Sequence, residues 1–202
     1  MTLYDLKPRF QALLRPLART LHAAGVTANQ VTLAACAVSV ALGAALCWYG
    51  DRAQLFLLLP VWLFLRMALN ALDGMLAREF GHKSRLGAFL NELSDVISDA
   101  ALLLPFAFLP HFGWWEVSLV VFLAALVEMT GVVAVSVGAS RRYDGPMGKS
   151  DRAFVLGALG LAIGLGMEPA QWQQVLFPAL AALLALTLVN RVRRALAEAA
   201  RS

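Results

Sequence analysis

Oxygen-bearing side chains recur at regular intervals in one stretch of an otherwise apolar sequence. Asn70 and Asp73 come first, and after a short basic segment Asn91, Asp95 and Asp99 follow at steps of four residues. Carboxylate and amide oxygens are the ligands that hard divalent cations such as Mg²⁺ and Mn²⁺ prefer. A cation held in this way could bind a phosphate, so the stretch predicts phosphate chemistry.

Helical spacing predicts how these side chains are positioned. Successive residues of an α-helix are turned by about 100°, so residues at steps of three and four share one face. The two predicted faces are Arg66, Asn70, Asp73 and Ala77 on one helix, and Gly87, Asn91, Asp95 and Asp99 on the next. Two antiparallel helices would point both faces toward one place. An ion pair of Arg66 with Asp73 is a purely structural alternative, but it leaves the later carboxylates unexplained.

The composition indicates that these helices lie in a membrane. The chain has 202 residues, 60% of them hydrophobic and 15% charged, and a mean hydropathy of +0.69, which is too apolar for a soluble domain. A transmembrane helix needs roughly 20 apolar residues. We therefore predict an all-α integral membrane protein with six transmembrane helices, at residues 31–50, 54–76, 87–109, 115–138, 152–167 and 174–190. Carboxylates at membrane depth are costly, so they should face the bundle interior or a wet cavity.

The N-terminal segment predicts a further helix of different character. Residues 3–21 place leucines at helical spacing on one face and cations on another. These cations are Lys7, Arg9, Arg15 and Arg19. Such an amphipathic helix is typical of the membrane interface, and a soluble helix docked on the protein is the alternative. We expect an amphipathic juxtamembrane helix at 1–25 and a single six-helix membrane domain at 26–202.

The distribution of cations predicts the orientation. All but two of the 17 Lys and Arg residues fall on one side of the predicted spans, and the exceptions are Arg52 and Arg66. The positive-inside rule places that side, with both termini and the polar stretch, in the cytoplasm. We expect an integral protein of a bacterial inner membrane, surrounded by membrane lipids. No nucleic-acid partner is needed to explain the net charge of +4.

A string of residues between the second and third predicted spans resembles the motif of the CDP-alcohol phosphotransferase family. It reads Asp73-Gly74, two residues, Ala77-Arg78, eight residues, Gly87, three residues, Asn91, three residues and Asp95. The stretches "VTANQVTLAA", from Val26, and "GKSDRA", from Gly148, are similar to the family's entries to the first and fifth spans. With the six-helix layout, the resemblance covers most of the chain.

The resemblance implies a membrane phosphotransferase of phospholipid biosynthesis. Such an enzyme moves a phosphatidyl group from a CDP-linked donor, CDP-diacylglycerol, to a hydroxyl of a small alcohol or polyol phosphate and releases CMP. It implies one or two Mg²⁺ or Mn²⁺ ions at the motif positions, Asp95 as the group that takes the acceptor proton, and a homodimer. The residues implied to bind the nucleotide are Asn29, Thr32, Asp73, Gly74, Ala77, Arg78 and Gly87.

The chain departs from the family pattern at two of four aspartate positions. Asn70 and Asn91 occupy places where the family carries aspartate, and an amide oxygen can ligate a cation without neutralising it. Asp99, one turn beyond Asp95, is the predicted extra carboxylate ligand. The outcomes are one cation instead of two, a site reshaped around Asp95 and Asp99, or lost catalysis with nucleotide binding retained. We expect an active enzyme; the alternative is a catalytically silent CDP- or lipid-binding protein that supports a partner enzyme.

Cations on the same predicted side could hold the acceptor. Arg141 precedes the fifth predicted span, and Lys149 and Arg152 lie at its entry. Because guanidinium and ammonium groups bind phosphate, these residues are predicted to hold a phosphate of the acceptor alcohol. Ordinary positive-inside anchoring is the alternative, and for Arg141 it is the favoured one. A small cation transporter is disfavoured, since the carboxylates gather on one side instead of crossing the bilayer.

Overall fold

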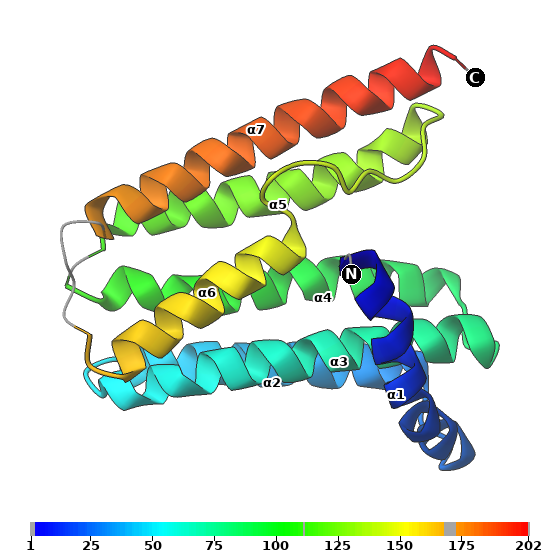
Figure 1. Ribbon diagram of the computed structural model, residues 1–202, viewed down its shortest axis with the longest axis horizontal. Helices are drawn as coiled ribbons and strands as arrows, with labels where there is room; N and C mark the ends of the chain where they lie inside the picture. Colours follow the sequence, from blue (N-terminus) through cyan, green and yellow to red (C-terminus); the bar gives the residue numbers. More distant parts are fainter. Residues whose placement is uncertain (1–2, 111, 168–172, 202) are drawn as a thin grey trace.

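The structure is a computed structural model that describes residues 3–110, 112–167 and 173–201, and within these ranges it contains helices and no strands (Figure 1). The elements are α1 (Leu3–Ala23), α2 (Ala28–Trp48), η1 (Ala53–Leu57), α3 (Leu58–Glu79), α4 (Arg85–Leu103), η2 (Leu104–Phe108), α5 (Trp114–Ser136), α6 (Lys149–Gly164) and α7 (Gln173–Ala199). The predicted all-α class is confirmed.

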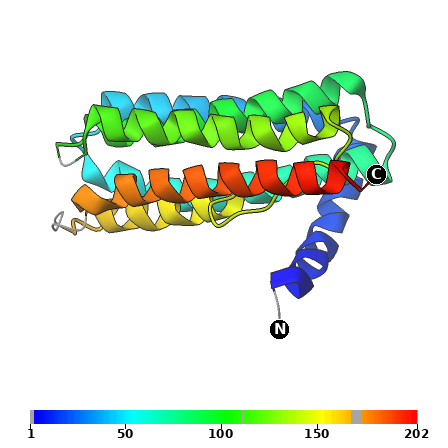
Figure 2. The same ribbon diagram turned by 90° about the horizontal axis from the view of Figure 1, so that it is seen from above.

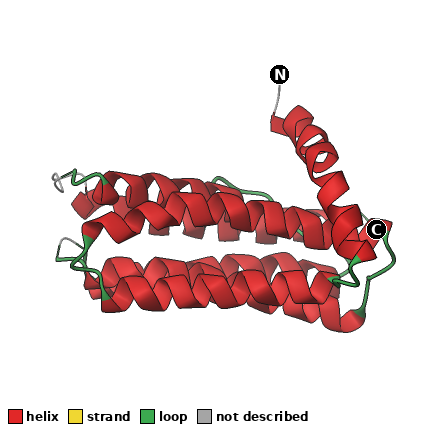
Figure 3. Ribbon diagram, turned by 90° about the horizontal axis from the view of Figure 1, so that it is seen from below, coloured by secondary structure: helices red, strands yellow, loops and turns green. Residues whose placement is uncertain are grey.

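The helices α2 to α7 run side by side as one bundle, and α1 leaves it at an angle (Figures 1 and 3). Figure 2 shows two layers, with α2, α4 and α5 in one and α3, α6 and α7 in the other. The α3–α4 turn, the α5–α6 loop and the C-terminus lie at one end of the bundle, which we call the polar end (Figure 1). The connections on either side of η1 and after η2 lie at the opposite end.

The membrane character of the chain is visible in its helices. Within the part of the chain that the structure describes, four helices are long and apolar enough to cross a membrane, at Ala28–Trp48, Ala53–Glu79, Trp114–Ser136 and Gln174–Ala199. The other two bundle helices differ, because α4 carries several charges and α6 has 16 residues, about 24 Å at 1.5 Å per residue. The count of six spans stays a prediction.

The helices and the predicted spans differ at their ends, and two of the differences, in α6 and α7, concern the site. The helix α6 begins at Lys149, because the carboxylate of Asp151 accepts a hydrogen bond from the backbone N–H of Gly148 (2.9 Å) and caps its first turn. We predicted that the last span ends at residue 190, but α7 continues to Ala199. Arg191, beyond the predicted end, points into the bundle, where its Nη1 donates to the carbonyl oxygen of Val127 at 2.5 Å.

Small residues let the helices of the bundle approach closely. A Cβ added to Gly43 in α2 would clash with the backbone carbonyl of Ala101 in α4. A Cβ at Gly160 in α6 would lie 2.9 Å from Cβ of Leu59 in α3. Such contacts are typical of membrane helix interfaces, where packing replaces the hydrophobic effect as the driving force. They bring α4 against α2 and α6 against α3.

Phenylalanines fill the bundle at the end opposite the polar end. Phe106 lies 5.5 Å from Phe56 and 6.2 Å from Phe177 between ring centroids. Phe112 packs edge-on against Phe177 at 5.0 Å. Because Phe56, Phe106 and Phe177 are fully buried, aromatic packing helps to join η1, η2 and α7 at this end.

The first helix is docked on the bundle. Ala18 of α1 is buried together with Leu72 and Met75 of α3, while Leu13 and Leu17 remain exposed. Arg15 adds two hydrogen bonds of 3.1 Å to the carboxylate of Glu79. A helix therefore occupies Leu3–Ala23, whereas its amphipathic interfacial character and the domain division at residue 25 stay predictions.

Candidate active site

The nucleotide-binding residues predicted from α2, α3 and α4 come together in the structure. Thr32 donates a hydrogen bond of 2.8 Å from Oγ1 to Oδ2 of Asp73, and both side chains are buried. Gly87 faces Asn29, since a Cβ at Gly87 would lie 2.8 Å from the Asn29 Oδ1. The helix α2 is held in place for this by its N-cap Thr27, which forms a reciprocal capping box with Gln30.

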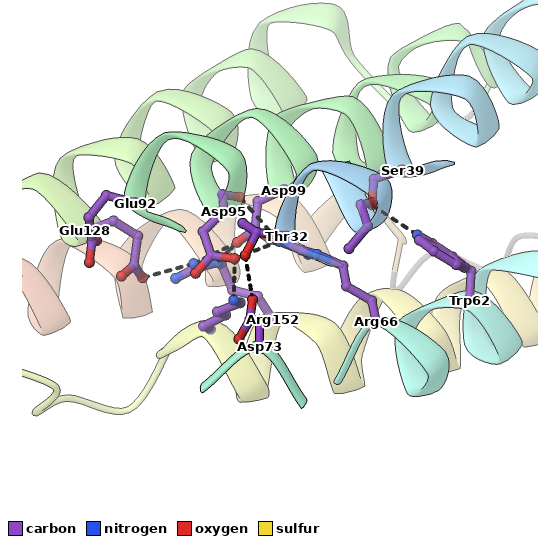
Figure 4. A network of polar contacts seen from close by, with 12 residues as sticks. Thr32, Ser39, Trp62, Arg66, Asp73, Glu92, Asp95, Asp99, Glu128 and Arg152 are labelled. Atoms are coloured by element: carbon purple, nitrogen blue, oxygen red, sulfur yellow. Dashed lines mark hydrogen bonds and ion pairs between the residues drawn. The ribbon is translucent and has the colours of Figure 1, made fainter. Parts of the chain in front are cut away.

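Asp95 lies at the centre of the site and is held by two cations. The Nζ of Lys149 donates to Asp95 Oδ1, and Nη2 of Arg66 donates to the same oxygen at 3.3 Å and to the Asp95 backbone carbonyl at 3.2 Å. Figure 4 shows Asp73 and Asp95 pointing into the same space between the helices. The two predicted helix faces therefore do meet.

Asp99 is bound by arginines on both oxygens. Arg66 Nη1 donates to Oδ1 at 2.6 Å, and Arg152 donates to Oδ2 from Nη2 at 2.7 Å and from Nε at 3.2 Å (Figure 4). Arg66 thus pairs across the helix interface with α4, and the alternative pairing with Asp73 in its own helix does not form. Asp99 links α4 to α3 and α6 with both oxygens paired to arginines, and its role as a cation ligand stays a prediction.

A buried carboxylate in α5 extends the network and makes a polar contact between helices, as its place inside a predicted span indicates. Glu128 accepts a hydrogen bond of 2.9 Å from Arg152 Nη2, and its other oxygen lies 3.7 Å from Arg191 Nη1. Its position inside a predicted span is the one sequence signal that could have revealed this, because such a charge needs a partner. Nothing in the sequence identified Arg191 as that partner.

Arg141 belongs to a separate contact at the rim of the site. Its guanidinium forms a two-pronged ion pair with Glu92 of α4, with 2.8 Å between Nη2 and Oε2, and lies over the ring of Tyr143. Each of the three cations predicted to hold the acceptor, Lys149, Arg152 and Arg141, is thus paired with a carboxylate of the chain.

The α5–α6 loop folds back along the bundle before α6 begins (Figure 1). Asp144 anchors it by accepting hydrogen bonds from Arg142 (2.7 Å) and Arg194 (2.6 Å). Burial alone would raise the pKa of Asp144, but these two guanidinium groups lower it below its ordinary value. The anchored loop sets the depth at which Lys149 and Arg152 meet α4.

The remaining motif residues lie on the outer side of the site. Asn70, Asn91 and Ala77 are half-buried, and Arg78 is exposed. The guanidinium of Arg78 lies along α3 above Gly74, where an added Cβ would come within 3.0 Å of Nη2. Arg78 is therefore available to an anionic ligand that approaches α3 over Gly74.

The donor set fits a hard divalent cation in type. Asp73, Asp95, Asn70 and Asn91 offer oxygen ligands only, and the negative charges of Asp73 and Asp95 repel each other, which a bound cation would offset. No group of three His, Cys, Asp or Glu side chains suited to a metal occurs among residues 3–110, 112–167 and 173–201. Any cation here would therefore depend on amide oxygens as well as carboxylates.

Comparison with known proteins places this geometry in context. The sequence model of the CDP-alcohol phosphatidyltransferases matches residues 25–194. The inner membrane protein YnbA of Escherichia coli is 50% identical over 97% of both chains. A phosphatidylinositol phosphate synthase of Mycobacteroides abscessus is 32% identical over 81% of this chain and 74% of its own.

Solved structures share the fold. The crystal structure of Mycobacterium tuberculosis phosphatidylinositol phosphate synthase with CDP-DAG bound superposes with a TM-score of 0.73, at 23% identity over 89% of this chain and 92% of that one. The same enzyme in complex with manganese and citrate gives a TM-score of 0.72, at 24% identity over 89% and 87% of the two chains.

Proposed function

Because the chain belongs to the CDP-alcohol phosphatidyltransferase family, a family of metal-dependent transferases, we propose that it transfers a phosphatidyl group from CDP-diacylglycerol to a small alcohol. The M. tuberculosis relative of the same fold binds CDP-DAG. The product side of the reaction is a phospholipid and CMP. The donor lipid and the acceptor hydroxyl are the parts of this proposal that go beyond family membership.

The observation that carries the proposal is the meeting of Asp73 and Asp95 beside Thr32 (Figure 4). It supports a nucleotide site between α2, α3 and α4. There Asn29, Thr32 and Gly87 would contact the nucleotide. Small Gly74 and Ala77 would let it approach α3 closely, and Arg78 would pair with the diphosphate.

The transfer is a displacement at phosphorus. The acceptor hydroxyl oxygen forms a bond to the phosphorus that carries diacylglycerol, the bond from that phosphorus to the CMP oxygen breaks, and CMP leaves with the electron pair. The proton goes to Asp95. Both side-chain contacts that the described residues make to this carboxylate use Oδ1, which leaves Oδ2 for the proton, while Lys149 and Arg66 hold the group in position.

A divalent cation, Mg²⁺ or Mn²⁺, would be held by Asn70, Asp73, Asn91 and Asp95, and when bound it would offset the charge of the diphosphate. Two of these ligands are amides, so we expect weaker binding than four carboxylates would give. Isothermal titration of the purified chain with Mn²⁺, in the presence of CDP, measures both the affinity and the number of ions.

The cations support a placement of the site at the cytoplasmic face of the inner membrane, with both termini on that side. The α3–α4 turn, the α5–α6 loop and the C-terminus, which carry most of them, share the polar end of the bundle (Figure 1). Fusions of a periplasm-active phosphatase to the C-terminus should be inactive, and an active fusion would overturn the orientation.

The decisive experiment is release of CMP. The full chain in lipid nanodiscs, given CDP-diacylglycerol, Mg²⁺ or Mn²⁺ and a panel of polyols with and without phosphate, should release CMP. Asp95→Asn should lower the rate by about 10²- to 10⁴-fold, the usual contribution of a general base. The same change at Asp51, in the η1 connection at the opposite end, is the matched control and should leave the rate unchanged.

Absence of CMP release with every acceptor, together with binding of CDP, would replace this proposal by a catalytically silent nucleotide-binding protein. In that case the double variant Asn70→Asp, Asn91→Asp locates the defect. Activity gained in it would show that the amides abolish catalysis.

A further inference from the structure

Charges at the polar end of the bundle are matched before any substrate binds. Each of four cations forms an ion pair with a carboxylate of the chain: Arg66, Lys149, Arg152 and Arg191 are shared among Asp95, Asp99 and Glu128. The neighbouring Arg141 is in turn paired with Glu92. The chain therefore supplies its own anions to cations that would otherwise attract an anionic acceptor.

Glu128 is the carboxylate whose only visible role is this pairing. Asp73 and Asp95 belong to the motif, and Asp99 ties α4 to α3 and α6. Glu128 lies in α5 and contacts Arg152 and Arg191, which are 4% and 2% exposed. Because both guanidiniums are out of contact with water, Glu128 is the group that a second anion would have to displace.

A phosphate on the acceptor would compete directly with Glu128. It brings a charge of about −1.5 to −2 and needs the same guanidinium donors. Binding it would leave a buried carboxylate beside the phosphate with its hydrogen bonds lost, and breaking a buried ion pair in this way is strongly unfavourable. Like charges side by side discriminate against the wrong ligand.

The space around Arg152 agrees with this exclusion. A cavity beside it has a volume of about 10 Å³ and is otherwise lined by apolar side chains, among them Leu103, Val120 and Met147. That is room for about one water molecule. A phosphate group does not fit in this cavity, so it could reach Arg152 only from the side that Asp99 and Glu128 occupy.

We propose that Glu128 is a specificity-determining residue and that the acceptor is an uncharged alcohol. This inference rests on the proposed phosphatidyl transfer and narrows its substrate class. Glu128 occupies Arg152 and Arg191 with a fixed negative charge, so a polyol can enter and its phosphorylated form is rejected. The relatives named as phosphatidylinositol phosphate synthases would differ from this chain in that respect.

Matched acceptor pairs test the proposal. CMP release is measured with glycerol against glycerol 3-phosphate and with inositol against inositol 1-phosphate, each at the same concentration. We expect the wild-type chain to release CMP about tenfold faster or more with the uncharged member. The phosphorylated member is rejected because its binding would leave a buried charge unpaired. Glu128→Gln, which keeps an oxygen for Arg152 but removes the charge, should lower this preference by about tenfold.

The control variant is Glu116→Gln, on the same helix. Glu116 caps α5 at its other end by accepting a hydrogen bond from Gly113 N–H, and its replacement should leave the preference unchanged. A purely structural role of Glu128 would lower the rates with both members of a pair equally, so the ratio separates specificity from stability. Preference of the wild-type chain for the phosphorylated members overturns the inference, whether or not Glu128→Gln folds. An unchanged ratio in Glu128→Gln also overturns it.

If no acceptor yields CMP, the proposed transfer itself is wrong. The role of Glu128 is then tested by ligand binding. Thermal unfolding is then followed with glycerol 3-phosphate as the probe. Stabilisation of Glu128→Gln but not of the wild-type chain supports the role of Glu128. Stabilisation of the wild-type chain, or of neither protein, contradicts it.

Discussion

The two ends of the bundle are held together by opposite means. At one end Phe56, Phe106 and Phe177 fill the interior without a charged group among them. From the middle of the bundle toward the polar end, Arg66, Asp99 and other charged side chains occupy the interior in ion pairs. Aromatic packing needs no specific polar partner, whereas buried charges are tolerated only while each one is paired.

This difference indicates which part of the bundle has a function beyond stability. Replacing buried ion pairs by well-packed apolar residues is often neutral or stabilising in proteins, so stability alone does not require charges at the polar end. The proposed transfer does require them, because a diphosphate must be bound and a proton moved. The polar end thus carries the groups that chemistry needs, and additional pairs that keep those groups buried without an unmatched charge.

The largest effect is expected when a carboxylate is removed from the buried ion pairs. Asp99→Ala leaves Arg66 and Arg152 without their shared partner, and we expect a loss of about 3–5 kcal/mol of stability. CMP release should fall as well, because Arg66 also holds Asp95. Unfolding of the purified protein in detergent measures the first effect, and a loss below about 1 kcal/mol would contradict the paired-charge account.

A cavity at the aromatic end should cost similar stability without touching the chemistry. Phe177→Ala removes a fully buried ring and is expected to destabilise the protein by about 3 kcal/mol, the low end for such changes. The rate of CMP release per folded molecule should stay at the wild-type value at a temperature where the variant is folded. A changed choice of acceptor in this variant would show that the two ends are coupled.

A smaller change sharpens the account of the nucleotide side. Thr32→Val keeps the shape of the side chain but leaves Asp73 Oδ2 without its hydroxyl donor. We expect the free energy of unfolding to fall by about 1–3 kcal/mol. The KM for CDP-diacylglycerol should rise, because Asp73 loses the contact that orients it. Serine at this position restores the hydroxyl and should restore the KM.

The smallest effect is expected at the exposed ion pair between Arg15 and Glu79. Glu79→Gln removes a charge that is open to solvent, where ion pairs contribute little. The unfolding temperature should therefore change within the error of the measurement. A clear loss of stability there would mean that α1 is held by charge and not by its apolar contact with α3.

The helical class, the four apolar spans and the meeting of the motif faces could all be predicted, because each depends on local periodicity. The sequence predicted that Asp73 and Asp95 lie on facing helices, and the structure confirms it. The partner of Arg66 could not be predicted, since Asp73 lies on the same face of its own helix and Asp99 lies on the facing helix. The length of α7 was underestimated because an arginine after an apolar run is normally a membrane boundary, and here Arg191 points inward.

By itself the sequence determined which residues are apolar, which share a helix face and which family they belong to, because these properties reside in residue type and in short-range spacing. Only the tertiary structure decided which charge meets which. Glu128 and Arg191 are far apart in the chain, and the packing of α5 against α7 brings them together. Pairing across a helix interface depends on the depth and rotation of both helices, which no local pattern records.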